Sequence, residues 1–345
     1  MSKLVLAAVA RRGPSTIRGE CSYVERLRQD DPPRIGPFVP LGRLDPDSQQ
    51  AVPARRFIAR GADGDRTYLV SLPRPDADPT RWSIEAEGAR RLALPGFQPV
   101  EEVGDAAGVP WSRSPYIPVL PLPGALLANG GPLPERVVRA LGAALARTLT
   151  TAHTHGVTHA GLSPNAVLLT TEGPRLSCFG AVRAAAPDGE RRAGLPGLDS
   201  GALAPEQADG GRPRPLGDVY ALGAVLAYAA TGHTVPERGE LPPSLAELIT
   251  ACLSRDPARR PQAQQVLTRL ESATSGPPAH TAAPPTALDT AGPATVLHSA
   301  APATVLDTAG PIPLPAPVVT ALARQSAHVL AAELPPPATL PWTDG

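Results

Sequence analysis

The sequence predicts an α+β fold in three parts: an antiparallel sheet with one helix, a larger and mainly helical region, and a disordered Pro/Ala/Thr-rich tail. From Phe38 to Leu72, short apolar segments separated by Gly, Asp and Pro are typical of strands. From Pro134 to His155, apolar residues recur at helical spacing behind a Pro-Glu start, and Gly156 ends the helix. From Ser272 the chain has few charged or aromatic residues, so it cannot bury enough apolar surface to order itself.

The composition excludes several classes of protein. The 345 residues carry a formal net charge of zero with basic and acidic residues intermixed, so we expect no nucleic-acid and no membrane partner. Cys21, Cys178 and Cys252 are odd in number, far apart in the sequence and without paired spacing, which argues against a disulfide framework and a zinc site and fits a reducing cytosol. The N-terminal apolar run is short for a signal peptide, and no later run approaches the roughly 20 apolar residues of a membrane span. We therefore expect a cytoplasmic protein.

One stretch indicates a family. Residues 159–180 read HAGLSPNAVLLTTEGPRLSCFG, which keeps the outline of a catalytic loop H-R-D-L-K-P-x-N-V-L-L followed by D-F-G. Further on, Ala204-Pro205-Glu206, the run DVYALGAVLAYAATG from Asp218, and LITACLSRDPARRPQAQQVLTRL follow in the expected order. On these residues the chain resembles bacterial Ser/Thr protein kinases of the actinobacterial type, over roughly residues 34 to 272.

The resemblance implies a two-lobed protein-kinase-like fold, with a small lobe at about 34–115 and a large lobe at about 116–272. We expect residues 1–33 to be a poorly ordered N-terminal extension, and both Met1 and a site near Val24 stay open as the translation start. Residues 273–345 should form the disordered tail, with three nonapeptide repeats at 286–312. Within it, Val318 to Leu334 is expected to be a marginal helix that orders only when docked.

The positions that handle protons, phosphate and metal in the family carry residues that cannot do so here. They are Ser71 for the phosphate-pairing lysine of the third strand, Gly161 for the proton-accepting aspartate, Ser163 for the catalytic-loop lysine, Ala166 for the metal-binding asparagine, and Cys178 for the aspartate of D-F-G. Because Lys3 is the only lysine in the chain, no neighbouring strand can supply one. So many losses together leave nothing to anchor Mg-ATP.

The loop after Leu44 is also degenerate. Where the family has glycines that close over the nucleotide phosphates, this chain has side chains that include Asp45, Asp47 and Gln50, with Val52 kept as a pocket wall. A carboxylate 4 Å from a phosphate charge costs about 4 kcal/mol at an effective dielectric near 20. We expect an ordinary acidic turn, no metal site and no cofactor, with Mg-ATP bound only if the protein is an active kinase after all.

Residues 80–94 are predicted to form an amphipathic helix that resembles the one whose glutamate pairs with the strand lysine. Glu85 aligns best with that glutamate, and Glu87 is the alternate. For both, a solvated acidic face or a local pair with Arg90 or Arg91 is the favoured interpretation.

Two other residues invite a chemical role. Asn165 could be a slipped metal ligand, but a shift of one residue on an extended segment turns the side chain to the opposite face. Cys178 could bind a soft metal or react as a thiolate, but a buried thiol without a basic neighbour is favoured.

The scaffold residues of the family are kept. The resemblance implies that His159 and Phe179, next to Gly180, are packing residues of an internal spine. It also implies an ion pair between Glu206 and Arg260, and hydrogen bonds from catalytic-loop amides to Asp218.

A fold that is kept while its reaction centre is missing favours a pseudokinase, a regulatory or scaffolding module for a protein partner such as an active kinase. The alternatives are an active Ser/Thr kinase with an unconventional site, or a tail that does the work. In the tail, Thr286-x-x-Asp289 and Thr304-x-x-Asp307 resemble sites that a phosphothreonine reader of the forkhead-associated class binds, although recent duplication explains the repeats more simply.

Overall fold

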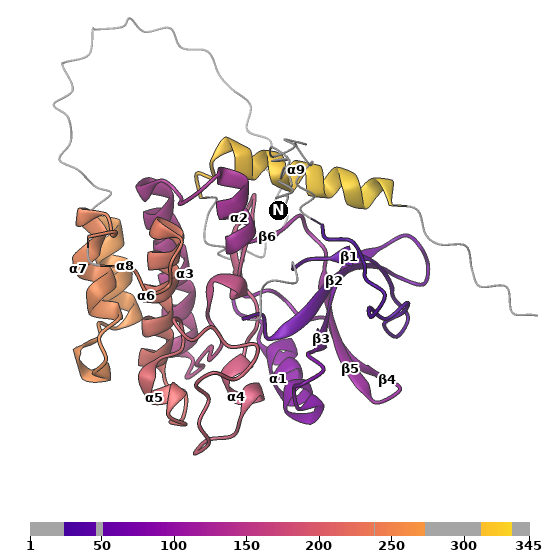
Figure 1. Cartoon of the computed structure of the whole chain (residues 1–345), viewed down its shortest axis with the longest axis horizontal. Coiled ribbons are helices and arrows are strands. Elements are labelled where there is room, and N and C mark those ends of the chain that lie inside the picture. Colours follow the sequence, from indigo (N-terminus) through magenta and orange to yellow (C-terminus); the bar gives the residue numbers. More distant parts are fainter. Residues whose placement is uncertain (1–23, 46–50, 238, 273–311, 333–345) are drawn as a thin grey trace, which may run out of the picture.

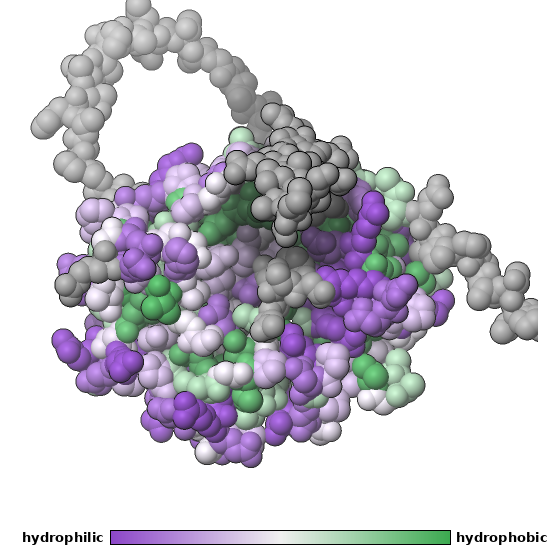
Figure 2. Space-filling model, viewed as in Figure 1, coloured by the Kyte–Doolittle hydropathy of each residue, from purple (hydrophilic) through white to green (hydrophobic). Residues whose placement is uncertain are grey.

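The computed structural model describes residues 24–45, 51–237, 239–272 and 312–332. A small lobe built on a sheet and a larger helical lobe lie side by side, and a C-terminal helix, α9, crosses both of them (Figure 1). On the face shown in Figure 2, hydrophilic and hydrophobic residues are intermixed among the described residues. Of the helices in the described ranges, none has both the length and the apolar character that a membrane span requires.

The small lobe is a five-stranded antiparallel sheet with one helix beside it. The strands lie in the order β1-β2-β3-β5-β4. They are β1 (Val39–Arg43), β2 (Ala54–Arg60), β3 (Thr67–Pro73), β4 (Glu102–Ala106) and β5 (Val109–Pro115). Helix α1 (Pro79–Arg91) begins behind Asp78, whose carboxylate accepts hydrogen bonds from the amides of Thr80 and Arg81. Strands β1 to β3 lie in the predicted region, and α1 covers the predicted helix except for its last three residues, whereas β4 and β5 follow later in the small lobe.

The two faces of this sheet have different environments. Phe57, Val70 and Trp111 belong to a buried apolar cluster on one face. Because side chains alternate along a strand, their neighbours in β2 and β3 point the opposite way, toward the large lobe. Among these, Arg56 of β2 lies directly across from Ser71 of β3.

The large lobe packs its helices around α3, the helix that the sequence predicts from Pro134 to His155. Its buried face includes Leu141, Leu145 and Leu149, and it packs against α6 and α8. The helices are α2 (Leu122–Asn129), α3 (Glu135–Thr154), α4 (Ala181–Ala185), α5 (Pro205–Ala208), α6 (Pro215–Thr231), α7 (Pro243–Cys252) and α8 (Ala263–Ser272), with short 3₁₀ turns η1 (Pro164–Ala166) and η2 (Pro257–Arg259). A three-stranded sheet contains β6 (Leu120–Pro121), β7 (Val167–Thr170) and β8 (Gly173–Leu176).

The N-terminal boundary differs from the prediction. Residues 24–33 pack on the small lobe, because Val24 is buried and the backbones of Glu25 and Arg43 exchange hydrogen bonds of 2.9 and 2.8 Å. The side chain of Arg43 also forms an ion pair of 2.6 Å with Asp31. The expected disorder is therefore wrong for residues 24–33, and residues 1–23 lie outside the described ranges.

The tail differs from the prediction as well. Helix α9 (Ala316–Ala331) covers the helix that the sequence expects at Val318, and it is docked on its own chain. Val318, Ala321 and Leu322 join the large-lobe core, whereas Val329 joins a small-lobe cluster. Disorder is therefore wrong for residues 312–332, because composition averaged over the tail hides this apolar stripe. The repeats up to residue 311 lie outside the described ranges.

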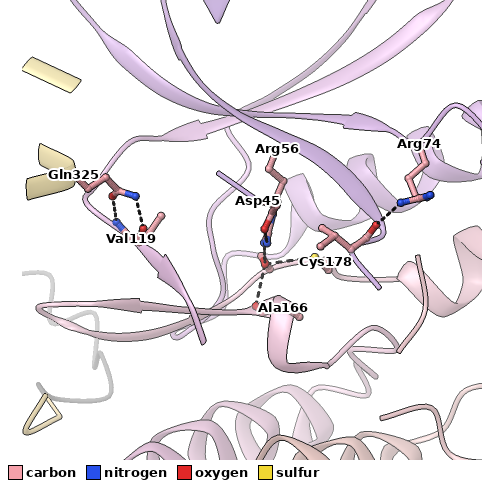
Figure 3. A network of polar contacts seen from close by, with 9 residues as sticks. Asp45, Arg56, Arg74, Val119, Ala166, Cys178 and Gln325 are labelled. Atoms are coloured by element: carbon pink, nitrogen blue, oxygen red, sulfur yellow. Dashed lines mark hydrogen bonds and ion pairs between the residues drawn. The ribbon is translucent and has the colours of Figure 1, made fainter. Parts of the chain in front are cut away.

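Gln325 fixes α9 to the connection between the lobes. Its Nε2 donates to the carbonyl of Val119 at 2.7 Å, and its Oε1 accepts from the Val119 amide at 2.8 Å (Figure 3). The same Oε1 accepts from the hydroxyl of Tyr116 at 3.2 Å. One turn further on, Arg60 of β2 donates to the carbonyl of Val329 at 3.0 Å. Helix α9 is thus bonded both to the interlobe connection and to the small lobe.

This geometry makes a prediction about stability. Replacing Gln325 by Met keeps the length of the side chain but leaves the buried amide and carbonyl of Val119 unpaired, which costs about 1–3 kcal/mol. Urea unfolding should show this loss. The matched control is Gln264→Met on the exposed face of α8, which should stay within about 0.5 kcal/mol. Equal losses in both variants would contradict the assigned role of Gln325.

Candidate functional site

A buried ion pair occupies the cleft between the lobes. Arg56 Nε lies 2.7 Å from Asp45 Oδ2, and Arg56 Nη2 contacts Asp45 Oδ1. The two side chains are 2% and 9% exposed. The third nitrogen, Arg56 Nη1, donates to Ser177 Oγ at 3.1 Å, and this hydroxyl donates to the carbonyl of Ala166 at 2.9 Å (Figure 3). A continuous polar chain therefore connects Asp45 and β2 to the large lobe.

Arg56 puts a cation beside Ser71, the position where the sequence predicts a missing lysine. Burial lowers the pKa of the Arg56 guanidinium, but the Asp45 carboxylate outweighs burial and raises the pKa above its ordinary value. The charge is therefore permanent and already neutralised. Sequence reasoning missed Arg56, although two adjacent arginines in an otherwise apolar strand were a signal.

The loop residues predicted to replace the phosphate cradle are partly described. Asp45 turns inward to Arg56, whereas Asp47 and Gln50 lie outside the described ranges. Val52 is buried just before β2, and its carbonyl accepts a hydrogen bond from Arg74 at 3.5 Å. Ala54 and Arg56, further along the chain, line the cavity beside Ser71, and Val52 does not, so the prediction that Val52 is a wall of a nucleotide pocket stays a prediction.

The position of the proton-accepting aspartate is sterically closed. A Cβ atom on Gly161 would lie 2.1 Å from the carbonyl oxygen of Cys178 and 3.0 Å from Ala181. Cys178 itself has a left-handed backbone, with φ of 62°, which turns this carbonyl toward Gly161. Ser163 and Ala166 are buried nearby. No side chain can enter here without moving the backbone.

Cys178 has the basic neighbour that the sequence interpretation did not expect. Burial raises the pKa of the thiol, and the nearby Arg56 charge lowers it by less. The thiol is therefore protonated at neutral pH, in line with an inert cysteine. Asn165 is buried in η1, and within the described ranges its Oδ1 has no hydrogen-bond partner.

Glu85 and Glu87 have different partners. Glu85 reaches across to α4, where Arg183 binds it with two hydrogen bonds of 2.7 and 2.9 Å. Glu87 pairs on the exposed side of α1 with Arg90 at 2.7 Å and with Arg91 at 3.2 Å. The favoured local pair is thus confirmed for Glu87 and wrong for Glu85, because Glu85 lies on the face of α1 that packs against α4.

The scaffold predictions hold in the structure. His159 is fully buried and packs against Phe97 and Phe179, with ring centroids 5.6 and 6.1 Å apart. Gly180 follows with a positive φ of 74°, and a Cβ there would collide with Glu85. The side chain of His159 is a packing element, as the sequence predicts.

Two carboxylates, those of Asp218 and Glu206, form the other predicted scaffold contacts. Asp218 accepts hydrogen bonds from the amide of His159 at 2.8 Å and from the amide of Ala160 at 2.9 Å. Glu206 binds Arg260 through two hydrogen bonds of 2.6 and 2.8 Å. Both predicted interactions are confirmed, and both lie in the large lobe.

The front of the cleft is narrow. A Cβ on Gly197 would lie 3.0 Å from the Cα of Pro53 and 3.1 Å from Arg74 Cδ. The segment before α5 therefore touches the loop that precedes β2. A substrate side chain has little room to enter from this side.

A solved structure decides the fold. The kinase domain of Mycobacterium tuberculosis PknI superposes with a TM-score of 0.53 at 21% identity, covering 69% of this chain and 96% of that domain. The chain has the two-lobed protein-kinase fold. At this level of identity the likeness establishes the kinase fold alone.

Sequence relatives of this kinase-fold chain include named Ser/Thr kinases of actinobacteria. It is 32% identical over 284 residues to the probable serine/threonine-protein kinase PkwA of Thermomonospora curvata, and 33% identical over 266 residues to the serine/threonine-protein kinase AfsK of Streptomyces griseus. These alignments cover 74% and 69% of this chain, but only 37% and 32% of the relatives. The chain thus spans about a third of the length of these relatives. No model of a protein family matches the chain.

The closed position at Gly161 yields a testable consequence. Gly161→Ala forces a contact with the carbonyl of Cys178 and should lower the free energy of unfolding by about 1–3 kcal/mol. Chemical denaturation measures this difference. In the control, Gly124→Ala on α2, the new methyl meets nothing closer than 3.9 Å, so stability should be unchanged or slightly higher. A Gly161→Ala variant as stable as the wild type would mean that the site can accept a side chain.

His159 predicts a pH dependence. Burial lowers the pKa of His159 from 6.5 to about 4, so the unfolded chain binds a proton more readily than the folded one. The contribution of the neutral His159 side chain to the free energy of unfolding is fully present above pH 6.5. It decreases by about 3 kcal/mol as the pH falls toward 4. Urea unfolding at these two pH values should show that His159→Phe loses less free energy of unfolding at the lower pH than the wild type does. His155→Phe, at an exposed histidine, should behave like the wild type.

Proposed function

We propose that this protein is a pseudokinase, a kinase-fold module without phosphotransferase activity that regulates or scaffolds a protein partner in the cytoplasm. One observation carries the proposal: Arg56 and Asp45 neutralise each other in the cleft, and Gly161 has no room for a carboxylate. Phosphoryl transfer requires the opposite, namely groups that orient the attacking hydroxyl and neutralise the charge of the γ-phosphate.

The intact scaffold supports a binding role. Asp218 binds backbone amides of the loop at His159, and Glu206 is the ion-pair partner of the buried Arg260, so both carboxylates stabilise the large lobe. These contacts maintain the fold of the large lobe. They do so although the positions that would carry catalytic side chains in a kinase lack them. Such a molecule can still present its surfaces to another protein.

The proposed partner is a protein, either an active Ser/Thr kinase or a phosphothreonine reader that binds the tail. The second possibility depends on Thr286, Thr295 and Thr304, which lie outside the described ranges. Co-expression with a Ser/Thr kinase followed by mass spectrometry tests it. Threonines that stay unmodified would remove the reader from the proposal.

An active Ser/Thr kinase with an unconventional site is the alternative function. The relatives favour it, because both are named as serine/threonine-protein kinases. The permanent cation of Arg56 also favours it, since a phosphate could compete with Asp45 for the guanidinium. In that case Mg-ATP would be the cofactor.

Thermal unfolding with Mg-ATP separates the two functions. A ligand present at 100 times its Kd stabilises the folded state by about 2.7 kcal/mol, which raises the melting temperature of a domain of this size by several degrees. We expect no such shift with millimolar Mg-ATP and no transfer of labelled phosphate to protein, while a known active kinase measured in parallel should show both. A clear shift together with label transfer would establish the alternative.

A further inference from the structure

Helix α9 covers a surface whose contacts are those that a helix requires. This surface, called the α9 seat below, consists of α2, the interlobe residues Tyr116 and Val119, and Arg60 of β2. Helix α9 lies across both lobes (Figure 1), and residues 273–311 separate it in the sequence from α8. The α9 seat therefore belongs to the two lobes, whereas its occupant comes from a segment beyond them.

The middle of the α9 seat requires a side-chain amide. Gln325 donates to the carbonyl of Val119 at 2.7 Å and accepts from the Val119 amide at 2.8 Å (Figure 3). Both residues are only 1% exposed. A helix with an apolar residue here would leave two backbone groups buried and unpaired, and only the Asn and Gln side chains combine an amide donor with a carbonyl acceptor. The α9 seat thus selects a helix with Gln at this position.

Arg60 fixes the direction of the bound helix. Its Nη2 donates at 3.0 Å to the carbonyl of Val329, which lies in the last turn of α9 before the helix ends at Ala331. The last four carbonyls of a helix have no partner within the helix, and a cation near them interacts favourably with the helix dipole. A helix in the opposite direction would present amide donors to the guanidinium, so the α9 seat accepts only the C-terminal end at the small lobe.

The buried face of α9 gives the rest of the pattern that the seat accepts. Val318, Ala321 and Leu322 are at most 1% exposed, and Val329 is 3% exposed. These residues lie seven, four and three positions before Gln325 and four positions after it, a spacing that places all of them on one helix face. The pattern is therefore apolar at these four positions, with a single Gln among them.

Helix α9 fits this surface but is poorly capped. Its N-cap residue is Pro315, whose side chain has no hydrogen-bond acceptor, and its first turn from Ala316 to Val319 contains no acidic residue. Its C-cap residue Ala332 is extended. An N-cap side chain strengthens a helix by roughly fivefold. A helix of the same pattern with Ser or Asp at the N-cap would therefore compete with α9.

A second copy of this chain is a weaker competitor. It offers the same poorly capped helix, whereas covalent attachment gives the resident α9 an effective concentration of up to about a millimolar at its seat. At micromolar protein concentrations the resident helix wins. A helix from another protein can overcome this advantage only through better caps or better packing.

We propose that the α9 seat is the docking site for an amphipathic helix of a partner protein, and that α9 occupies the site until such a helix displaces it. The partner helix carries Gln, the four apolar positions defined above, and a polar N-cap residue. The docking site rests on the proposed function, because it names where the protein partner of the pseudokinase binds.

The test uses the full-length chain and a fluorescein-labelled peptide of residues 312–332 that carries Pro315→Asp, which supplies an N-cap carboxylate. Fluorescence anisotropy measures its affinity for the wild type and for Leu322→Asp, a chain whose own α9 is weakened while the α9 seat is unchanged. Because the resident helix reduces the apparent affinity of the wild type, Leu322→Asp should bind the peptide at least tenfold more tightly. Leu322→Ala is a smaller change that serves if Leu322→Asp does not unfold cooperatively.

Variants of the peptide locate the contact. Gln325→Leu in the peptide should weaken its binding to the Leu322→Asp chain at least tenfold, because both hydrogen bonds to Val119 are lost. His328→Leu, at an exposed position of α9, is the matched control and should bind like the parent peptide.

Three results would overturn the proposal. The first is no binding of the peptide to Leu322→Asp or Leu322→Ala at up to about 200 μM, which would make the α9 seat a purely structural joint. The second is equal affinity for the wild type and these variants, which would place the peptide elsewhere. The third is a wild-type dimer at micromolar concentration in sedimentation that Leu322→Asp abolishes, which would assign the seat to a second copy.

The two proposals can fail separately. A melting-temperature shift with Mg-ATP together with label transfer would defeat the proposed function and leave the peptide affinities as they are. Failure of the peptide to bind would remove the docking site, while a cleft without response to Mg-ATP would still support a pseudokinase.

Discussion

The ion pair between Arg56 and Asp45 determines what the cleft can do. A guanidinium taken out of water alone would cost several kcal/mol, so Asp45 must stay where it compensates this charge. Asp45, two residues after β1, is therefore held against Arg56 of β2. Because Arg56 also binds Ser177, which binds the carbonyl of Ala166, the same pair joins the two lobes (Figure 3).

The parts of the fold that the sequence predicts correctly depend on residue type and order. His159, Asp218 and the pair of Glu206 with Arg260 are recognised because each contact needs that particular side chain in a fixed motif. The long periodic helix at Pro134–His155 is recognised for a similar reason, since its pattern extends over many turns.

The parts that could not be predicted depend on geometry or on distant residues. Arg56 and Asp45 are 11 residues apart, and only the register of β2 shows that Arg56 faces the cleft. Glu85 and Arg183 are 98 residues apart, so a local charge pattern cannot reveal their pairing. The closure at Gly161 follows from the backbone angle of Cys178, which residue types alone do not specify.

Helix α9 changes where the folded unit ends. A fragment that stopped at Ser272, where the resemblance to kinases places the boundary, would lack the amide of Gln325 and the apolar stripe of Val318 and Leu322. The peptide groups of Val119 would then be hydrated, and the segment Tyr116–Val119 would lose its hydrogen bonds to α9. In such a shortened protein the segment between the lobes would be more open and more easily cleaved by proteases than in the full chain. Ligand affinities measured on it would therefore belong to a different conformational ensemble.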